Sequence, residues 1–151
     1  MEPLTEKEYF VRGCTALLDA VGGAIHHIGN VHKYAREEDR PEKTLFVITT
    51  DGMENASRAY SYDRVRTMIQ RQQEKYGWEF LFLGANIDAA KEAGRFGIRP
   101  ECTADYHADS QGTKVIYASV CEAVHQVRSC AAPLQANWKR KIERDFKERN
   151  K

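Results

Sequence analysis

Short apolar runs and longer helical patterns alternate along the chain. Consecutive apolar or β-branched residues at 45–49 and 78–86 predict buried strands, and 102–108 predicts a weaker third strand. Apolar residues that recur every three or four positions predict helices over 15–31, 61–76 and 87–97, from Ser110 onward, and over 134–146. Ser61 and Ser110 are expected to cap the helices that follow them, and Gly77 and Gly97 to end the helices before them.

This alternation of strands and helices predicts the fold class. Near-continuous apolar strands separated by helices favour an α/β, three-layer, doubly wound Rossmann-like domain, in which a mainly parallel sheet carries helices on both faces. In such folds ligands gather at the carboxyl ends of the strands. Asp51 follows the first strand, and Asn86 and Asp88 follow the second.

The sheet has fewer strands than such a domain normally contains. Three strands are recognisable, and sheets of this kind usually have about five or six. The run at 45–49 is apolar enough for a central strand, yet nothing earlier in the chain offers a second neighbour, except the short segment 8–11. We therefore expect one edge of this strand to be open, or to be covered by 8–11.

Two patterns predict how helices pack. Gly22 and Gly23 lie inside the first predicted helix, where a glycine pair is typical of close packing. In the last helix, basic residues surround an apolar stripe of Trp138, Ile142 and Phe146. Acidic residues are interspersed among the basic ones, so packing on the sheet is favoured over a contact with nucleic acid or a membrane surface.

Composition narrows the function classes. The 151 residues carry a formal net charge of +1 and are 42% hydrophobic, which gives no overall attraction to nucleic acid or to acidic membranes. No window is apolar enough for a membrane span, and the N-terminus has no signal-peptide pattern. The scattered cysteines predict reduced, mostly buried thiols in a cytoplasmic protein, and they are Cys14, Cys102, Cys121 and Cys130.

The most specific candidate site is a Mg²⁺ site formed by Asp51 and Thr15. A threonine hydroxyl at a helix start and an aspartate at a strand end supply the oxygen ligands that Mg²⁺ prefers. The alternative is structural, with Thr15 as a helix N-cap and Asp51 as an Asx-turn residue before Gly52. Both interpretations stay open on chemistry alone.

Two coupled motifs resemble the von Willebrand factor A domain. "GCTALLDAVG" at 13–22 is similar to that family's second metal-binding segment, and "FVITTDGMENAS" at 46–57 is similar to its third. The resemblance covers about residues 13–127 and is to undecorated bacterial members. It implies a non-catalytic protein–protein interaction module with Thr15 and Asp51 as direct metal ligands. The residues expected around these ligands are Thr50, Gly52, Glu54 and Asn55.

The family's first metal segment, Asp-x-Ser-x-Ser, has no counterpart in this chain. The chain therefore resembles a truncated domain that lacks the N-terminal half, and its metal-ion-dependent adhesion site is incomplete. Weak or absent Mg²⁺ binding is expected. The division that follows is an N-terminal extension at 1–12, a von Willebrand factor A-like domain at 13–131 and a basic amphipathic helix at 132–151.

An unpaired strand exposes backbone N–H and C=O groups that invite pairing with another chain. We expect a homodimer, formed by edge pairing or by exchange of the N-terminal segment, while any other protein partner stays unknown. The interface residues expected are Thr44, Leu45, Phe46, Val47, Ile48 and Thr49. The alternative function is a Mg²⁺-dependent hydrolase or phosphatase that uses Asp51, with Glu54 or Asp88 as a second acid.

Overall fold

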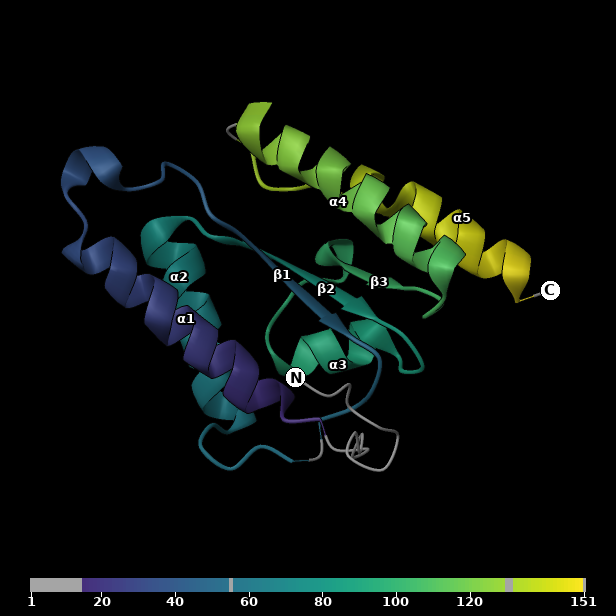
Figure 1. The fold of residues 1–151 in the computed structure, drawn as a ribbon, viewed down its shortest axis with the longest axis horizontal. Helices are drawn as coiled ribbons and strands as arrows, with labels where there is room; N and C mark the ends of the chain where they lie inside the picture. Colours follow the sequence, from purple (N-terminus) through teal and green to yellow (C-terminus); the bar gives the residue numbers. More distant parts are fainter. Residues whose placement is uncertain (1–14, 55, 130–131, 151) are drawn as a thin grey trace, which may run out of the picture.

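Three parallel strands form an open sheet in the order β1–β2–β3 (Figure 1). The computed structural model describes residues 15–54, 56–129 and 132–150. The strands are β1 at Leu45–Thr50, β2 at Glu79–Gly84 and β3 at Thr103–Asp105. The register places Val47 beside Leu81, and Leu83 beside Ala104. The predicted α/β class with a parallel sheet is confirmed.

Helices cover both faces of this sheet. Helices α1, α2 and α3 lie on one face, and α4 and α5 lie on the other (Figure 1). The Tyr62 hydroxyl at the start of α2 donates to Oε1 of Glu92 in α3 over 2.5 Å, which holds these two helices side by side. The bounds are α1 at Leu17–Tyr34, α2 at Tyr62–Tyr76, α3 at Ala89–Arg95, α4 at Ser110–Ser129 and α5 at Arg140–Arg149, with 3₁₀ turns η1 at Glu37–Asp39, η2 at Pro100–Cys102 and η3 at Ala136–Lys139.

The core is centred on β2, the middle strand. Its residues from Phe80 to Leu83 are all buried, since helices cover both faces and strands flank both edges. In β1, Phe46 and Val47 are only partly buried and Thr49 is exposed. Within the described residues β1 is therefore an edge strand, as its missing neighbour predicted. Segment 8–11, the candidate cover, lies outside the described residues.

The predicted helix caps are confirmed for α2 and corrected for α4. Ser61 Oγ accepts the N–H of Arg64 at 3.2 Å, and Gly77 ends α2 with φ of 65°. At α4, however, the Asp109 carboxylate accepts the Gly112 N–H at 2.8 Å, and Ser110 is already the first helical residue. The N-cap is therefore Asp109, because an ionised carboxylate is the stronger acceptor for an unpaired N–H at a helix start.

The buried face of α4 differs from the predicted stripe. The apolar residues that recur at helical spacing in this part of the sequence, and so predict one buried face, are Ile116, Val120, Val124 and Val127. The residues that are buried are Gly112, Ile116, Ser119 and Ala123, while Val124 is 38% exposed. Helix α5 packs against α4. Of the remaining stripe, Val120 and Val127 are partly buried against the core, so the buried face is shifted toward the small residues Gly112, Ser119 and Ala123 and leaves out Val124.

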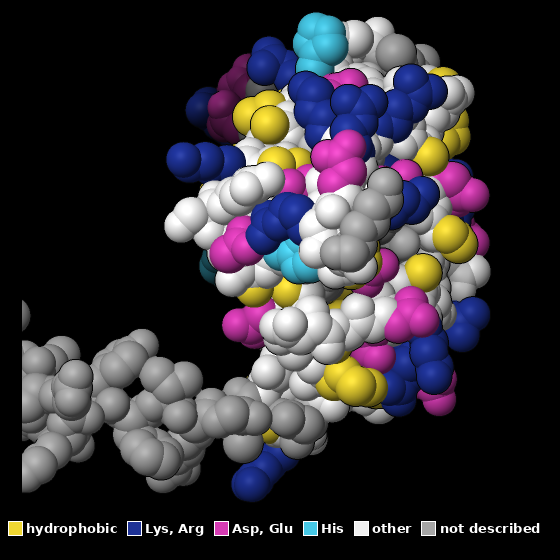
Figure 2. All heavy atoms as spheres, turned by 90° about the vertical axis from the view of Figure 1, so that its right-hand side faces the viewer, with side chains coloured by type: hydrophobic (Ala, Val, Ile, Leu, Met, Phe, Trp, Pro, Cys, Tyr) yellow, Lys and Arg dark blue, Asp and Glu magenta, His cyan; other side chains and the backbone are white. Residues whose placement is uncertain are grey.

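The predicted apolar stripe packs against the rest of the fold, but the helix expected over 134–146 is shorter, because Trp138 lies in η3 and α5 begins at Arg140. Trp138 and Ile142 are buried, and the Trp138 indole N–H donates to the Glu101 carbonyl at 2.9 Å. Phe146 stacks on His107 with ring centroids 4.8 Å apart. On the face shown in Figure 2, Lys and Arg side chains gather toward the top with Asp and Glu among them. In the described part of the chain, no helix combines the length and apolarity that crossing a membrane requires.

The glycine pair in α1 offers a matched test of packing. A Cβ at Gly22 would lie 2.4 Å from Cδ1 of the Tyr60 ring, whereas a Cβ at Gly23 meets nothing within 4 Å. Gly22→Ala should lower the free energy of unfolding, because overpacking of about 1–3 kcal/mol exceeds the helix-propensity gain. Gly23→Ala should raise it by up to about 1 kcal/mol. Urea unfolding measures both, and equal shifts of one sign would contradict the close packing at Gly22.

Candidate functional site

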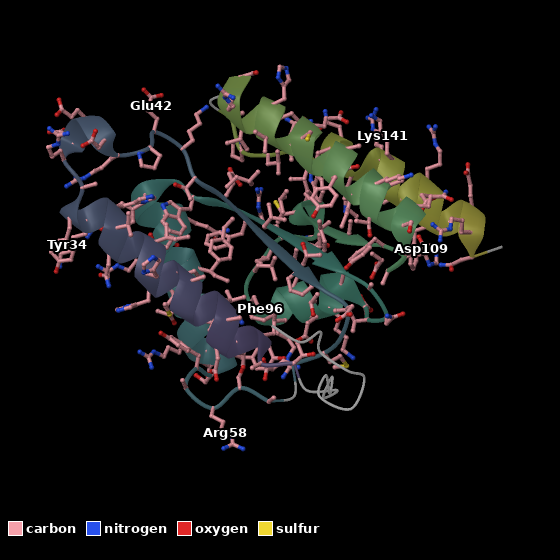
Figure 3. The ribbon with its side chains drawn as sticks, in the orientation of Figure 1. Tyr34, Glu42, Arg58, Phe96, Asp109 and Lys141 are labelled. Carbon is pink, nitrogen blue, oxygen red and sulfur yellow. The ribbon has the colours of Figure 1, made fainter. Side chains whose placement is uncertain are left out.

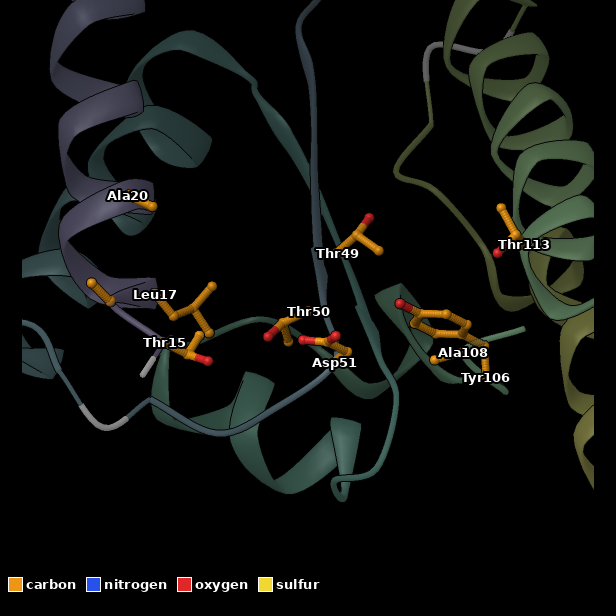
Figure 4. A pocket seen from close by; sticks show the side chains of 10 residues that line it. Thr15, Leu17, Ala20, Thr49, Thr50, Asp51, Tyr106, Ala108 and Thr113 are labelled. Carbon is orange, nitrogen blue, oxygen red and sulfur yellow. The ribbon is translucent and has the colours of Figure 1, made fainter. Parts of the chain in front are cut away.

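A cleft of about 540 Å³ lies at the carboxyl end of β1 (Figure 4). The start of α1, the last residues of β1 and the β3–α4 connection form its walls. Its polar lining consists mainly of threonine hydroxyls, one carboxylate and one phenol. These side chains are Thr15, Thr49, Thr50, Asp51, Tyr106 and Thr113.

Thr15 and Asp51 share this cleft, although 36 positions separate them in the sequence. Figure 4 shows the Thr15 hydroxyl directed toward Thr50 and Asp51. Thr15 Oγ1 lies 3.5 Å from the point that a Cβ at residue 52 would occupy, so Gly52 leaves room for its close approach. The two predicted direct ligands are thus brought together.

The turn after β1 is organised by Thr50. Its hydroxyl donates to the Gly52 carbonyl at 2.8 Å and accepts the Gly52 N–H at 3.3 Å. The predicted Asx turn at Asp51 is therefore corrected, since the neighbouring threonine makes these bonds. From the β2–α3 connection, the Asn86 amide donates to the Asp51 carbonyl at 3.4 Å. Asn86 itself has a left-handed backbone with φ of 59°.

The Asp51 carboxylate faces the cleft. In residues 15–54, 56–129 and 132–150, no hydrogen bond or ion pair engages its oxygens. Burial raises the pKa of the Tyr106 hydroxyl, and the negative charge of Asp51 raises it further. Asp51 and Tyr106 therefore present an acid and a phenol to the same space, with the phenol kept protonated.

Glu54 has a different role from the one the sequence suggested. Its carboxylate accepts the N–H groups of Leu18 at 2.7 Å, Ala56 at 2.9 Å and Ser57 at 2.6 Å, and the Ser57 hydroxyl at 2.7 Å. Burial opposes ionisation, but these donors outweigh it and hold the pKa of Glu54 below its usual value. The carboxylate binds the start of α1 to the loop after β1.

The start of α1 is capped from this loop. The residue before α1 is Ala16, and no side-chain cap comes from it. Thr15 is therefore not the N-cap, which corrects the structural alternative for that residue. The Leu18 N–H bonds Glu54, and the Asp19 N–H donates to Ser57 Oγ at 2.9 Å. Long-range acceptors replace the local cap that the sequence suggested.

Asp19, in the first turn of α1, also binds the loop between β1 and α2. Its carboxylate accepts the N–H groups of Arg58 at 3.0 Å, Ala59 at 3.0 Å and Tyr60 at 2.9 Å. The bond from Arg58 is the largest of the effects that lower its pKa. Sequence reasoning missed this clamp of Asp19, Glu54 and Ser57. An acid in the first turn of a helix was the available signal, but its partners lie about 40 positions away.

The carboxylates that follow β2 and end β3 are engaged in hydrogen bonds outside the Asp51 cleft. Asp88 caps α3 by accepting the Lys91 N–H at 3.1 Å. Asp105, at the end of β3, accepts the Ala89 N–H at 2.9 Å. Neither carboxylate is among the residues that line the cleft of Asp51. The structure thus gathers Thr15, Thr50, Asp51 and Gly52 and directs Glu54 and Asp88 to other roles, while Asn55 lies outside the described residues.

The donor set of the cleft fits part of a Mg²⁺ shell. Hydroxyl and carboxylate oxygens suit this hard ion, which commonly keeps several waters. In the described segments, no three His, Cys, Asp or Glu side chains gather closely enough to hold a metal. Thr15 and Asp51 would contribute directly, and water would complete the coordination.

No family model matches the chain, and the searches of curated proteins and solved structures found no similar protein.

We expect Glu54→Gln to destabilise the protein by about 1–2 kcal/mol, because buried N–H donors would face an amide in place of a carboxylate. The lowered pKa of Glu54 means that its stabilisation is present above the ordinary value of 4.5 and is lost as pH falls through the folded-state pKa. The free energy of unfolding of the variant should therefore fall less steeply than that of the wild type as the pH is lowered. Glu148→Gln, at an exposed position of α5, is the control. Equal unfolding free energies for the two variants would contradict the clamp.

Proposed function

We propose that this chain is a non-catalytic protein–protein interaction module that resembles the second half of a von Willebrand factor A domain, and that its partner pairs with the open edge of β1. The observation that carries this proposal is an apolar parallel strand whose second edge has no neighbour among the described residues, beside a cleft that holds Asp51. Open edges of this kind pair readily with other chains.

The backbone of β1 offers a regular set of partners along this edge. Thr44 and Thr50 direct their carbonyls toward β2, where they accept the N–H groups of Glu79 and Ala85 at 2.9 Å. Alternate residues of a strand direct their backbone groups to opposite sides. Leu45, Val47 and Thr49 therefore direct theirs away from β2, toward the open edge.

Helix α4 gives this edge an apolar wall. Lys43 Nζ, just before β1, donates to the Val127 carbonyl near the end of α4 over 2.5 Å, and Thr113 near its start lines the cleft at the other end of β1. Helix α4 thus runs along β1. Tyr117 and Val124 share the helix face of Thr113 and are 68% and 38% exposed. An incoming strand would cover this face as it pairs with β1.

A second copy of this chain is the partner that we favour. Two identical edges can pair about a two-fold axis, because each copy presents the same donors, acceptors and apolar wall to the other. The hydrolase alternative has less support. Glu54 and Asp88 were its candidate second acids, and both carboxylates are occupied by backbone N–H groups. Asp51 would then act with Tyr106 alone.

If two copies pair through the edge of β1, removal of one backbone N–H group on that edge should disrupt the dimer. Thr49→Pro removes an N–H on the open edge, and proline is tolerated at such positions because the β1–β2 bonds are untouched. Sedimentation should show a dimer for the wild type and mainly monomer for Thr49→Pro. Thr49→Val keeps the N–H and should stay dimeric. A monomeric wild type at high micromolar concentration would refute the proposal, and circular dichroism would verify that each variant is folded.

Metal binding at the cleft is testable with Mn²⁺ as a probe for Mg²⁺. Electron paramagnetic resonance should detect weak binding of Mn²⁺ to the wild type, because water must supply most of the ligands. Asp51→Asn should abolish it, since the amide removes the charged ligand. Asp63→Asn, on the exposed start of α2, should leave it unchanged. Equal binding by the wild type and Asp51→Asn would exclude the ion from this cleft.

A further inference from the structure

A second cavity of about 560 Å³ lies at the opposite end of the sheet from Asp51. Helices α1 and α2 and the α1–β1 connection enclose it, and Thr44 and Trp78, just before β1 and β2, mark its place at the amino ends of the strands. Its most buried lining residues are apolar, since Ile25 and Trp78 are buried and Met68 is partly buried. This volume falls within the range of sites that bind small organic molecules.

Positive side chains dominate the rim of this cavity. Lys33 comes from the end of α1, Arg40 from the connection, and Arg64 and Arg71 from α2, where they lie about two turns apart. Glu42 is the acid among the lining residues. It lies on the α1–β1 connection, where its side chain points outward in Figure 3. The cavity therefore has a large local excess of positive charge in a chain whose formal net charge is only +1.

These cations are not neutralised by neighbouring acids. Across the described ranges, none of Lys33, Arg40, Arg64 and Arg71 takes part in an ion pair, although Arg36, Arg95 and Arg149 all do. Arg40 is nonetheless held in place, because its guanidinium donates to the carbonyls of Ala35 at 3.2 Å and Lys33 at 3.3 Å. Cations gathered without counter-charges repel one another, so a bound anion would stabilise them.

The remaining lining suits the organic part of such an anion. The amides of Asn30 and Gln72 offer both donors and acceptors. Tyr76 is half exposed beside the cavity, and Trp78 lies beneath it with its ring in edge contact with His32 at 5.5 Å. Aromatic rings and amides recognise planar heterocycles, whereas guanidinium groups bind phosphates through paired hydrogen bonds.

We propose that this cavity binds a nucleotide, with the phosphate held by Lys33, Arg40 and Arg71 and the base placed toward Tyr76 and Trp78, while Arg64, which donates to the Ala59 carbonyl and lies over the Tyr60 ring, adds positive charge at the far end. An inorganic phosphate would satisfy the cations but leave the apolar part of the cavity empty. A neutral ligand would leave the cations uncompensated. This site is independent of the open edge of β1 and of the Asp51 cleft, since its cationic walls are on α1, α2 and the connection between α1 and β1.

The first experiment compares three classes of probe on the full chain. Isothermal titration calorimetry with AMP, GMP, CMP and UMP, with the matching nucleosides, and with inorganic phosphate separates the contributions of base and phosphate. At least one nucleotide should bind at least ten-fold more tightly than both its nucleoside and inorganic phosphate. If none of the four does so, the proposal is overturned.

Matched variants then locate the binding. Arg71→Gln and Lys33→Gln remove one charge each from opposite walls, and both positions are exposed, so folding should be unaffected. Each should weaken the best nucleotide about ten-fold, the effect of losing one charged hydrogen bond. Arg66→Gln removes the same charge from the opposite face of α2, where its side chain lies against Gly97. Equal weakening by Arg66→Gln and Arg71→Gln would show general attraction to surface charge and would overturn the site.

Discussion

The Glu54 carboxylate is the interaction on which the candidate site depends. It gathers three N–H groups and one hydroxyl from α1 and from the loop after β1, and so joins segments 36 positions apart. Asp19 completes the clamp from the helix side with three further acceptor contacts. Without these bonds the start of α1 would have unpaired N–H groups and no fixed position over the turn. Thr15 and Asp51 meet because this clamp holds their two backbones together.

The same clamp supports β1, which has a single neighbour, β2, among the described residues. A strand with one neighbour is held by half the usual number of backbone bonds, so it needs support from outside the sheet. At its carboxyl end β1 is fixed through the turn that Glu54 and Thr50 organise. At its other end Lys43 reaches the last turn of α4. Strand β1 is therefore held extended from both ends, as the proposed pairing with a second strand would require.

The sequence predicted local features well and long-range ones poorly. Ser61 and Gly77 define α2 through contacts within one or two turns, and both predictions are confirmed. The parallel sheet followed from the alternation of apolar strands and helices, and the number of recognisable strands predicted the single neighbour that β1 has among the described residues. On α4 the predicted apolar stripe is correct for Ile116, Val120 and Val127 and wrong for Val124, which is exposed, because periodicity does not record which neighbouring elements cover a helix. Glu54 was expected near a metal because its position in a motif says nothing of the distant N–H groups that engage it. Long-range polar contacts depend on how elements meet, and no periodic pattern records them.

Because the strands are parallel, the Asp51 cleft and the cationic cavity lie at opposite ends of the sheet. All three strands finish at the edge where hydroxyls and the Asp51 carboxylate lie, and all begin at the edge nearest the cationic cavity. A strand that pairs with β1 would cover Thr49 and part of the Asp51 cleft. It would not cover Arg64, Arg71 or Lys33, whose helices lie on one face of the sheet and not at its open edge. A protein partner and an anionic ligand would thus bind without competition, and coupling between them could pass through α1 or β1, since residues of α1 line both sites and β1 extends from just after Thr44 at one to Thr50 at the other.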